Sequence, residues 1–127
     1  MPEIVIHAAA SYKEPDNYQE DILTNALGTS IIIENSQKVM VKRLIYFQTA
    51  LCYGEVKEKI IPIDHPINPI QTSYAISKTL GKHYIRMSCL NFVSFRLANI
   101  YGPRNITGPI PTFFSRLIHN KPCFVVD

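Results

Sequence analysis

The residues Glu3-Ile-Val-Ile-His-Ala-Ala-Ala10 form a short apolar run, rich in β-branched side chains, close to the start of the chain. Such a run is typical of a strand buried on both faces of a parallel sheet. The alanines leave the backbone approachable at the carboxyl end of the strand, where open α/β sheets bind their ligands. A tight strand–loop junction explains the same residues equally well, and we expect His7 to be a structural residue.

Strand and helix patterns alternate along the rest of the chain. Two more buried-type strands are predicted at Leu44–Gln48 and Asn91–Arg96, and a fourth is predicted to begin at Phe124–Val126. Helical patterns cover residues 17–37, the segment that follows a cap at Thr72 or Ser73, and residues 109–120. This alternation predicts an α/β fold with a parallel sheet and right-handed crossovers.

The helical patterns also predict which side chains are buried. In the first helix, one face at the helical period carries Ile22, Ala26, Thr29 and Ile33. Asn25 also falls on the buried side, where an amide is unfavourable unless it finds a partner. In the helix after Thr72, the predicted apolar stripe consists of Ile76, Leu80, Tyr84 and Met87. The Pro-rich stretch from Val56 to Gln71 is predicted to be a loop over the site.

Composition limits the classes of function. The 127 residues are 46% hydrophobic and 18% charged, which suits one domain with a packed core. The net charge of +3 comes without a Lys/Arg cluster, so no nucleic-acid partner is expected. No apolar run is long enough to span a bilayer. Three widely spaced cysteines predict neither a disulfide framework nor a metal site, and they favour reduced thiols in a cytoplasmic protein.

The stretch Thr72-Ser-Tyr-Ala-Ile-Ser-Lys78 holds a tyrosine and a lysine four residues apart. On a helix, Tyr74 and Lys78 project from one face, one turn from each other. An ammonium stabilises phenolate and lowers a tyrosine pKa that is ordinarily about 10. A tyrosine adjusted in this way can take and return the proton of a sugar hydroxyl. The same spacing is common on solvated helix faces, so the pair carries weight only in the company of other motifs.

Several motifs occur together in a fixed order. They are Ile6-His-Ala-Ala-Ala10, Asn25 with Gly28-Thr29, Thr49 with Tyr53-Gly54, Asn68-Pro69, Tyr74 with Lys78, and Arg96 with Asn99-Ile-Tyr-Gly-Pro-Arg104. With this set the chain resembles the extended short-chain dehydrogenase/reductases, specifically the NAD-dependent nucleotide-sugar epimerases and dehydratases. The resemblance covers nearly the whole chain. It implies a Rossmann-type doubly wound parallel sheet, of which this chain would form the C-terminal half.

The resemblance also implies roles for individual residues. Tyr74 would be the catalytic acid/base, Lys78 would hold the nicotinamide ribose of NAD and lower the pKa of Tyr74, and Thr49 would bind the sugar hydroxyl that is oxidised. The cofactor would be lined by Ala8, Ala9, Ala10 and Asn25. The substrate would be bound by Asn99 at its diphosphate and by the loop at Gly108 and Ile110.

The reaction implied by the resemblance is a transient oxidation, with C4 epimerisation of a UDP-sugar as the specific expectation. Dehydratases of the family place an acidic residue one or two positions after the Ser/Thr, whereas this chain has Ala50 and Leu51. Neither side chain can move a proton, so the sequence favours an epimerase over a dehydratase. A ketoreductase is an alternative, because simple reduction needs only Thr49, Tyr74 and Lys78. A catalytically dead nucleotide-sugar-binding remnant is another.

The main departure from the family lies at the front of the chain. A dinucleotide site normally needs a Gly-rich turn after its first strand, and no spacing of the five glycines gives G-x-G-x-x-G. We therefore expect residues 1–127 to be a partial NAD(P)-binding domain, a fragment that lacks the first strands and most of the C-terminal substrate region. Half of such a sheet would expose an apolar edge and face. The expected partners are a second copy of the chain or the missing N-terminal half.

Overall fold

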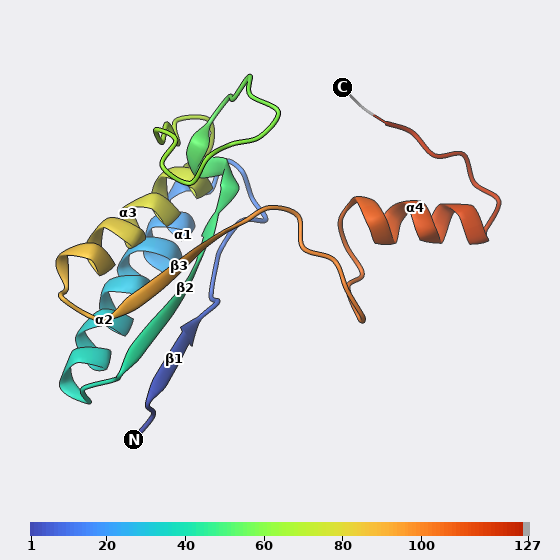
Figure 1. The fold of residues 1–127 in the computed structure, drawn as a ribbon. Coiled ribbons are helices and arrows are strands. Elements are labelled where there is room, and N and C mark those ends of the chain that lie inside the picture. The colour runs from blue at the N-terminus through green and yellow to red at the C-terminus, as the bar shows by residue number, and fades with distance from the viewer. Residues whose placement is uncertain (126–127) are drawn as a thin grey trace.

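The computed structural model describes residues 1–125 and contains one parallel sheet. Its strands are β1 (Ile4–His7), β2 (Arg43–Thr49) and β3 (Phe92–Leu97), in the order β1-β2-β3 (Figure 1). Val5 pairs with Leu44, and Leu44 pairs with Phe92. The predicted parallel α/β fold is thus confirmed, and all strands end at the same edge of the sheet. The predicted fourth strand is wrong for Phe124–Val125, which is irregular, while Val126 lies outside the described residues.

Helices cover one face of this sheet. A continuous helical rod consists of α1 (Tyr18–Asp21), the π-helical turn η1 (Ile22–Leu27) and α2 (Gly28–Lys38), and beside it lies α3 (Ser73–Met87) (Figure 1). Thr72 caps α3 as predicted, because its Oγ1 accepts a hydrogen bond of 3.0 Å from the Ala75 amide. A 3-10 turn, η2 (Ala50–Tyr53), follows β2, and α4 (Pro109–Ile118) stands apart from the sheet. None of the helices within residues 1–125 has the length and apolarity needed to cross a bilayer.

The π-helical turn changes which side chains of the rod are buried. Ala26, Thr29 and Ile33 are buried as predicted, but Ile22 is 54% exposed. A π-helical turn holds more residues than an α-helical turn, so it rotates the residues before it relative to those after it. Asp21 consequently takes the buried position predicted for Ile22, with 2% of its surface exposed.

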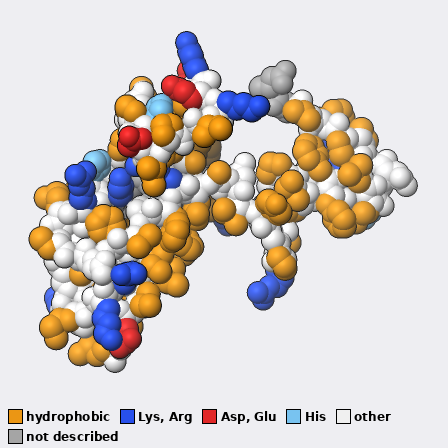
Figure 2. All heavy atoms as spheres, viewed as in Figure 1, with side chains coloured by type: hydrophobic (Ala, Val, Ile, Leu, Met, Phe, Trp, Pro, Cys, Tyr) orange, Lys and Arg blue, Asp and Glu red, His pale blue; other side chains and the backbone are white. Residues whose placement is uncertain are grey.

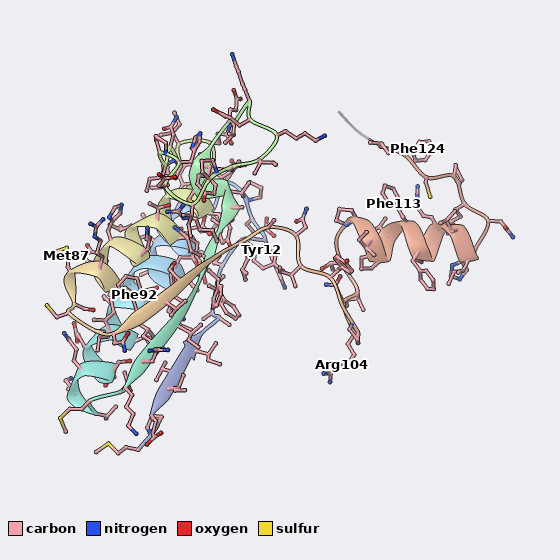
Figure 3. All side chains as sticks on the ribbon, viewed as in Figure 1. Tyr12, Met87, Phe92, Arg104, Phe113 and Phe124 are labelled. Atoms are coloured by element: carbon pink, nitrogen blue, oxygen red, sulfur yellow. The ribbon has the colours of Figure 1, made fainter. Side chains whose placement is uncertain are left out.

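The apolar stripe of α3 lies on the opposite side from the one predicted. Ile76, Leu80, Tyr84 and Met87 are between 39% and 76% exposed, and Figure 3 shows Met87 pointing away from the body. The buried face of α3 instead carries mostly small or polar residues, namely Ala75, Ser77, Lys78, Thr79, Gly81 and Ile85. Small residues let α3 approach the rod and β2 closely, and this close approach is worth more than burial of the larger stripe.

The other face of the sheet has no covering layer among the described residues. Side chains that alternate with the buried ones point to this face, including Ile4, Ile6, Val93 and Phe95, each at least 37% exposed. Figure 2 shows hydrophobic side chains gathered along the strands and over α4. The core lies only on the helix side, where Ile33, Leu44, Tyr46 and Ile85 pack together. The expected exposed apolar face of a half sheet is therefore confirmed.

Candidate active site

Thr49 and Tyr74 meet at the carboxyl edge of the sheet. Thr49 ends β2, is 6% exposed, and accepts a hydrogen bond of 3.2 Å from the Leu51 amide, which fixes its rotamer. Tyr74 lies in the first turn of α3, half-buried, with its phenol within hydrogen-bonding reach of the Thr49 hydroxyl. Two hydroxyl groups that converge in this way can hold a single substrate oxygen between them.

The environment of Tyr74 favours the protonated phenol. Burial raises the pKa of Tyr74, and the hydrogen bond from Thr49 opposes this rise. The neighbouring Tyr12 and the buried Asp21 raise the pKa further, because each would place negative charge near a phenolate. The sequence-based expectation that Lys78 lowers this pKa is not met in the structure without a cofactor, since Lys78 makes no contribution to the shift.

Lys78 is buried in the structure and lies against a different tyrosine. Only 1% of its surface is exposed, and its Nζ lies 4.3 Å from the centroid of the Tyr46 ring. The Tyr46 hydroxyl in turn donates a hydrogen bond of 2.9 Å to the Lys78 carbonyl, which fixes ring and helix relative to each other. Burial lowers the pKa of Lys78 to about 8, because the ammonium loses its hydration. Lys78 is therefore an available cation at the base of the site, held by an aromatic face.

Asn25 finds the partners that its buried position requires. Its side-chain amide exchanges two hydrogen bonds of 2.9 Å with the backbone of Ser11, one donated and one accepted. It also donates a bond of 3.0 Å to the Ser77 hydroxyl on α3. Asn25 is fully buried and sits in the π-helical turn, a geometry that is frequent at functional sites. This amide joins the loop after β1 to the helix that carries Tyr74 and Lys78.

The loop after β1 is shaped to admit a flat ligand. Ala8 and Ala9 are exposed and Ala10 is half-buried, so only methyl groups cover the backbone at this edge. Lys78 and Tyr74 supply a cation and a phenol on the neighbouring helix. These residues fit the nicotinamide and ribose end of a dinucleotide. The described residues offer no Gly-rich turn for its pyrophosphate.

The long loop of residues 55–71 is anchored next to the site. The Asn68 amide donates a hydrogen bond of 2.9 Å to the Cys52 carbonyl. Gly54 has a φ of 72°, and a Cβ there would overlap the Asn68 carbonyl oxygen, so the motifs Tyr53-Gly54 and Asn68-Pro69 form one unit. Arg96 reaches across from β3, donating bonds of 2.6 Å to the Tyr53 hydroxyl and 2.7 Å to the Ile63 carbonyl. The prediction that this segment is a loop at the site is therefore confirmed.

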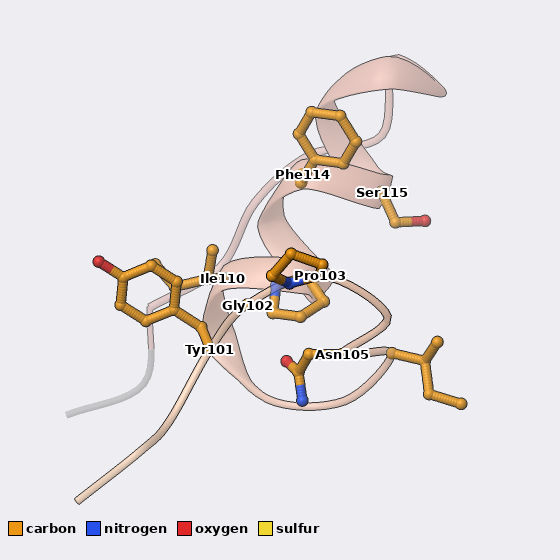
Figure 4. Close-up of a pocket in the computed structure, with 9 residues that line it drawn as sticks. Tyr101, Gly102, Pro103, Asn105, Ile110, Phe114 and Ser115 are labelled. Atoms are coloured by element: carbon orange, nitrogen blue, oxygen red, sulfur yellow. The ribbon is translucent and has the colours of Figure 1, made fainter.

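The predicted substrate residues of the C-terminal arm are not brought to Tyr74. Asn99, Gly108 and Ile110 are exposed, and the segment that carries them leads away from the sheet to α4. A cavity of about 560 Å³ lies within this arm, apart from Thr49 and Lys78 (Figure 4). It is lined by Tyr101, Gly102, Pro103, Asn105, Ile106, Ile110, Pro111, Phe114 and Ser115. Gly108 serves as the cap of α4, with a φ of 96° that suits glycine.

Three residues join the site that the sequence did not single out. Ser11 and Ser77 bond Asn25, and the ring of Tyr12 lies edge-on to Tyr74, with 6.2 Å between ring centroids. Ser77 could have been anticipated, because a helix that buries Lys78 also turns its neighbour inward. No sequence pattern pairs Tyr12 with Tyr74, since 62 positions separate them.

His7 is buried and hydrogen-bonded, in agreement with the structural role expected for it. Its Nε2 lies 2.8 Å from Thr29 Oγ1, and Thr29 donates its own proton to the Asn25 carbonyl. Nε2 must therefore carry the hydrogen, which makes the imidazole neutral when Nδ1 is bare. Burial, and secondarily the charge of Lys78, lowers the pKa of His7 from 6.5 to about 4.

The chain is expected to lose stability as the pH falls from 6.5 towards 4. In that interval the unfolded chain binds a proton at His7 that the folded chain rejects, so acidification favours unfolding by up to about 3 kcal/mol. Urea unfolding midpoints at pH 7 and pH 4.5 measure this loss. The His7→Gln variant serves as the matched comparison and should show a smaller decrease. Equal decreases in both proteins would contradict the assignment.

Comparison with known proteins places this arrangement in a family. The family model described as the NAD dependent epimerase/dehydratase family matches residues 1–127. The putative UDP-glucose 4-epimerase of Methanocaldococcus jannaschii is 31% identical over 94% of this chain and 43% of its own length.

Two solved structures are similar in both fold and sequence. The Bordetella bronchiseptica enzyme WbmH, in complex with NAD+, is 51% identical with a TM-score of 0.87, over 98% of this chain and 42% of the other. The enzyme WbmG from the same organism, in complex with NAD and UDP, is 50% identical with a TM-score of 0.90, over 96% of this chain and 39% of the other. This chain thus spans about two fifths of the length of its relatives. The chain belongs to the NAD-dependent epimerase/dehydratase family.

Proposed function

We propose that this chain carries the acid/base site of an NAD-dependent nucleotide-sugar epimerase, acting at C4 of a UDP-sugar. The observation that supports this most directly is the convergence of the Thr49 and Tyr74 hydroxyls at the carboxyl edge of the sheet, with Lys78 one turn further along α3. The complex of WbmG with NAD and UDP supports both the cofactor and the nucleotide.

In the proposed reaction, Thr49 and Tyr74 hold the 4-hydroxyl of the sugar between them. Tyr74 takes the proton of this hydroxyl as the carbon is oxidised, and returns it when the carbon is reduced from the opposite face. Bound NAD supplies the redox chemistry by accepting and returning hydride. Tyr74 ionises more readily beside a positive charge, which the oxidised cofactor brings and which offsets the rise caused by burial. Lys78 would bind the ribose and add a second positive charge.

The turn after Thr49 supports an epimerase over a dehydratase. η2 places Ala50 and Leu51 where an elimination would need a carboxylic acid, and neither carries an ionisable group. A ketoreductase remains the second candidate, since Thr49, Tyr74 and Lys78 are sufficient for reduction. Formation of the C4 epimer of a supplied UDP-hexose, without net change in NADH, distinguishes the two.

The partner that we propose for this chain is a Gly-rich half that completes the dinucleotide site and the domain. The described residues fit only one end of the cofactor, and the apolar sheet face of Ile4, Ile6, Val93 and Phe95 lacks a covering layer. Residues 1–127 would then form part of an NAD-binding domain. In the same proposal, free Cys52, Cys89 and Cys123 support a reducing compartment, the cytoplasm.

Calorimetric titration with NAD+ tests the proposed function. We expect weak binding to the 127-residue chain alone, and tighter binding when UDP-sugar and a Gly-rich half from a relative are present. Lys78→Met should weaken binding, whereas the neighbouring Lys82→Met should not. Absence of NAD+ binding under every condition would refute the proposal.

A second copy of the chain is the other proposed partner, and its supporting surface is the outer side of the helices. Leu23, Leu27 and Ile31 on the rod are 46–49% exposed, beside the exposed stripe of Ile76, Leu80 and Tyr84 on α3. Two neighbouring helices with apolar outer faces form a surface that a two-fold symmetric dimer can bury against itself.

The Leu80→Glu variant is expected to dissociate such a dimer. Burial of an unpaired carboxylate at the centre of the helix surface should raise the dissociation constant by at least about tenfold. Sedimentation velocity over a range of concentrations measures this shift. Phe95→Glu, on the sheet face, is the matched control and should leave the dimer intact. If Phe95→Glu dissociates the dimer and Leu80→Glu does not, the sheet face is the interface.

A further inference from the structure

Tyr12 is an exposed aromatic residue at the entrance of the site. Its ring is 62% exposed and meets Tyr74 edge-on, with centroids 6.2 Å apart and an interplanar angle of 63°. Figure 3 places Tyr12 at the carboxyl end of the sheet, near the point where the chain leaves β3. An exposed ring of this size stabilises the fold little, so its position next to the acid/base calls for a role in binding.

The backbone that presents Tyr12 is held rigidly. Its neighbour Ser11 exchanges two hydrogen bonds of 2.9 Å with the fully buried Asn25, and Asn25 bonds Ser77 on α3. Tyr12 and Tyr74 are therefore positioned by the same amide, one through the loop and the other through the helix. A side chain on such a support can order a ligand at small entropic cost.

The geometry of the reaction places the sugar next to Tyr12. A hydroxyl that transfers its proton to Tyr74 must lie within hydrogen-bonding distance of that phenol, so the ring of the hexose lies about one ring width away. The Tyr12 ring occupies a neighbouring position at this distance, on the solvent side. Hexoses present C–H groups on their ring faces, and an aromatic ring packs against such groups without needing a specific hydroxyl pattern.

We propose that Tyr12 is a substrate-contacting residue whose ring packs against the hexose that Tyr74 deprotonates. This inference rests on the proposed function and adds to it a residue that orients the sugar. It also fits an epimerase, because contact through a flat apolar surface tolerates both configurations at C4, whereas hydrogen bonds to the 4-hydroxyl would favour one of them.

Binding measurements on the 127-residue chain with saturating NAD+ test this role. UDP-galactose, UDP-glucose and UDP alone are titrated by calorimetry, and saturation-transfer NMR reports protein contacts of the hexose protons. Tyr12→Phe keeps the ring and should bind both sugars within about twofold of the wild type. Tyr12→Ala should weaken both sugars by about tenfold and reduce saturation transfer to the hexose, with UDP and NAD+ binding unchanged. Tyr18→Ala removes another tyrosine, 60% exposed on α1, as the matched control and should change nothing.

Several outcomes would overturn the role of Tyr12. Equal sugar binding by wild type and Tyr12→Ala would refute it, as would an equal loss of UDP, which would assign the ring to the nucleotide. A loss of NAD+ binding alone would assign it to the cofactor. A wild-type chain that binds NAD+ but no UDP-hexose refutes the role of Tyr12 while the cofactor part of the proposed function stands. A chain that binds neither refutes both.

Discussion

Replacing Tyr74 with phenylalanine is expected to lower the rate of epimerisation of a UDP-hexose by about 10²- to 10⁴-fold. Phenylalanine keeps the ring and its edge-on contact with Tyr12, but it removes the only group next to Thr49 that can exchange a proton at the substrate oxygen. Thr49 cannot substitute, because its hydroxyl has no adjacent base and caps the Leu51 amide. Binding of NAD+ and UDP should change little, so the loss should appear in kcat and not in KM.

The interconversion of UDP-glucose and UDP-galactose, followed by NMR with NAD+ and a Gly-rich half supplied, measures this effect. Tyr84→Phe is the matched control, since Tyr84 lies on the exposed side of the same helix. Ultraviolet titration of tyrosinate gives a second reading that needs no turnover. Without cofactor, the transition absent from Tyr74→Phe should lie above the ordinary tyrosine pKa, and NAD+ should move it to lower pH in the wild type. A Tyr74→Phe protein with full activity would show that the acid/base is another group.

The order of strands and the identity of the central site residues could be predicted because each depends on local sequence. The apolar run at Ile4–His7, the run of β2 and the cap at Thr72 each specify an element without reference to the rest of the chain. Parallel strands that end at one edge then bring Thr49 to the same edge as the start of α3, where Tyr74 lies.

The errors concern features that depend on neighbours in space. The π-helical turn has no sequence signature, and it moved Ile22 to the surface and Asp21 to the interior. The burial of Lys78 could not be read from its charge, since lysine is rarely buried without a partner. Here the partner is the ring of Tyr46, 32 positions earlier, and the contact keeps Lys78 from lowering the pKa of Tyr74.

The close approach of α3 to the rod makes Gly81 the most sensitive position of the buried polar cluster. A Cβ added there would lie 2.9 Å from the Asn25 carbonyl oxygen, 2.9 Å from the Tyr46 hydroxyl and 3.0 Å from Thr29 Oγ1. Each of these atoms already makes a hydrogen bond, so none can move without weakening one. The added methyl group therefore forces α3 away from the rod.

Gly81→Ala is accordingly expected to destabilise the chain by about 1–3 kcal/mol, although alanine ordinarily stabilises a helix interior relative to glycine. Gly28→Ala is the matched comparison, because Gly28 begins α2 and a Cβ there meets only the Leu23 carbonyl oxygen at 3.6 Å. That variant should gain about 0.5–1 kcal/mol. The opposite signs, measured by urea unfolding, test whether packing or helix propensity governs α3. Because the displaced atoms belong to Asn25 and Tyr46, which position Ser11 and Lys78, Gly81→Ala should also weaken NAD+ binding, whereas Gly28→Ala should leave it intact. Equal and stabilising effects of both variants would show that α3 can shift at no cost, and that the hydrogen bonds around Asn25 do not fix the site.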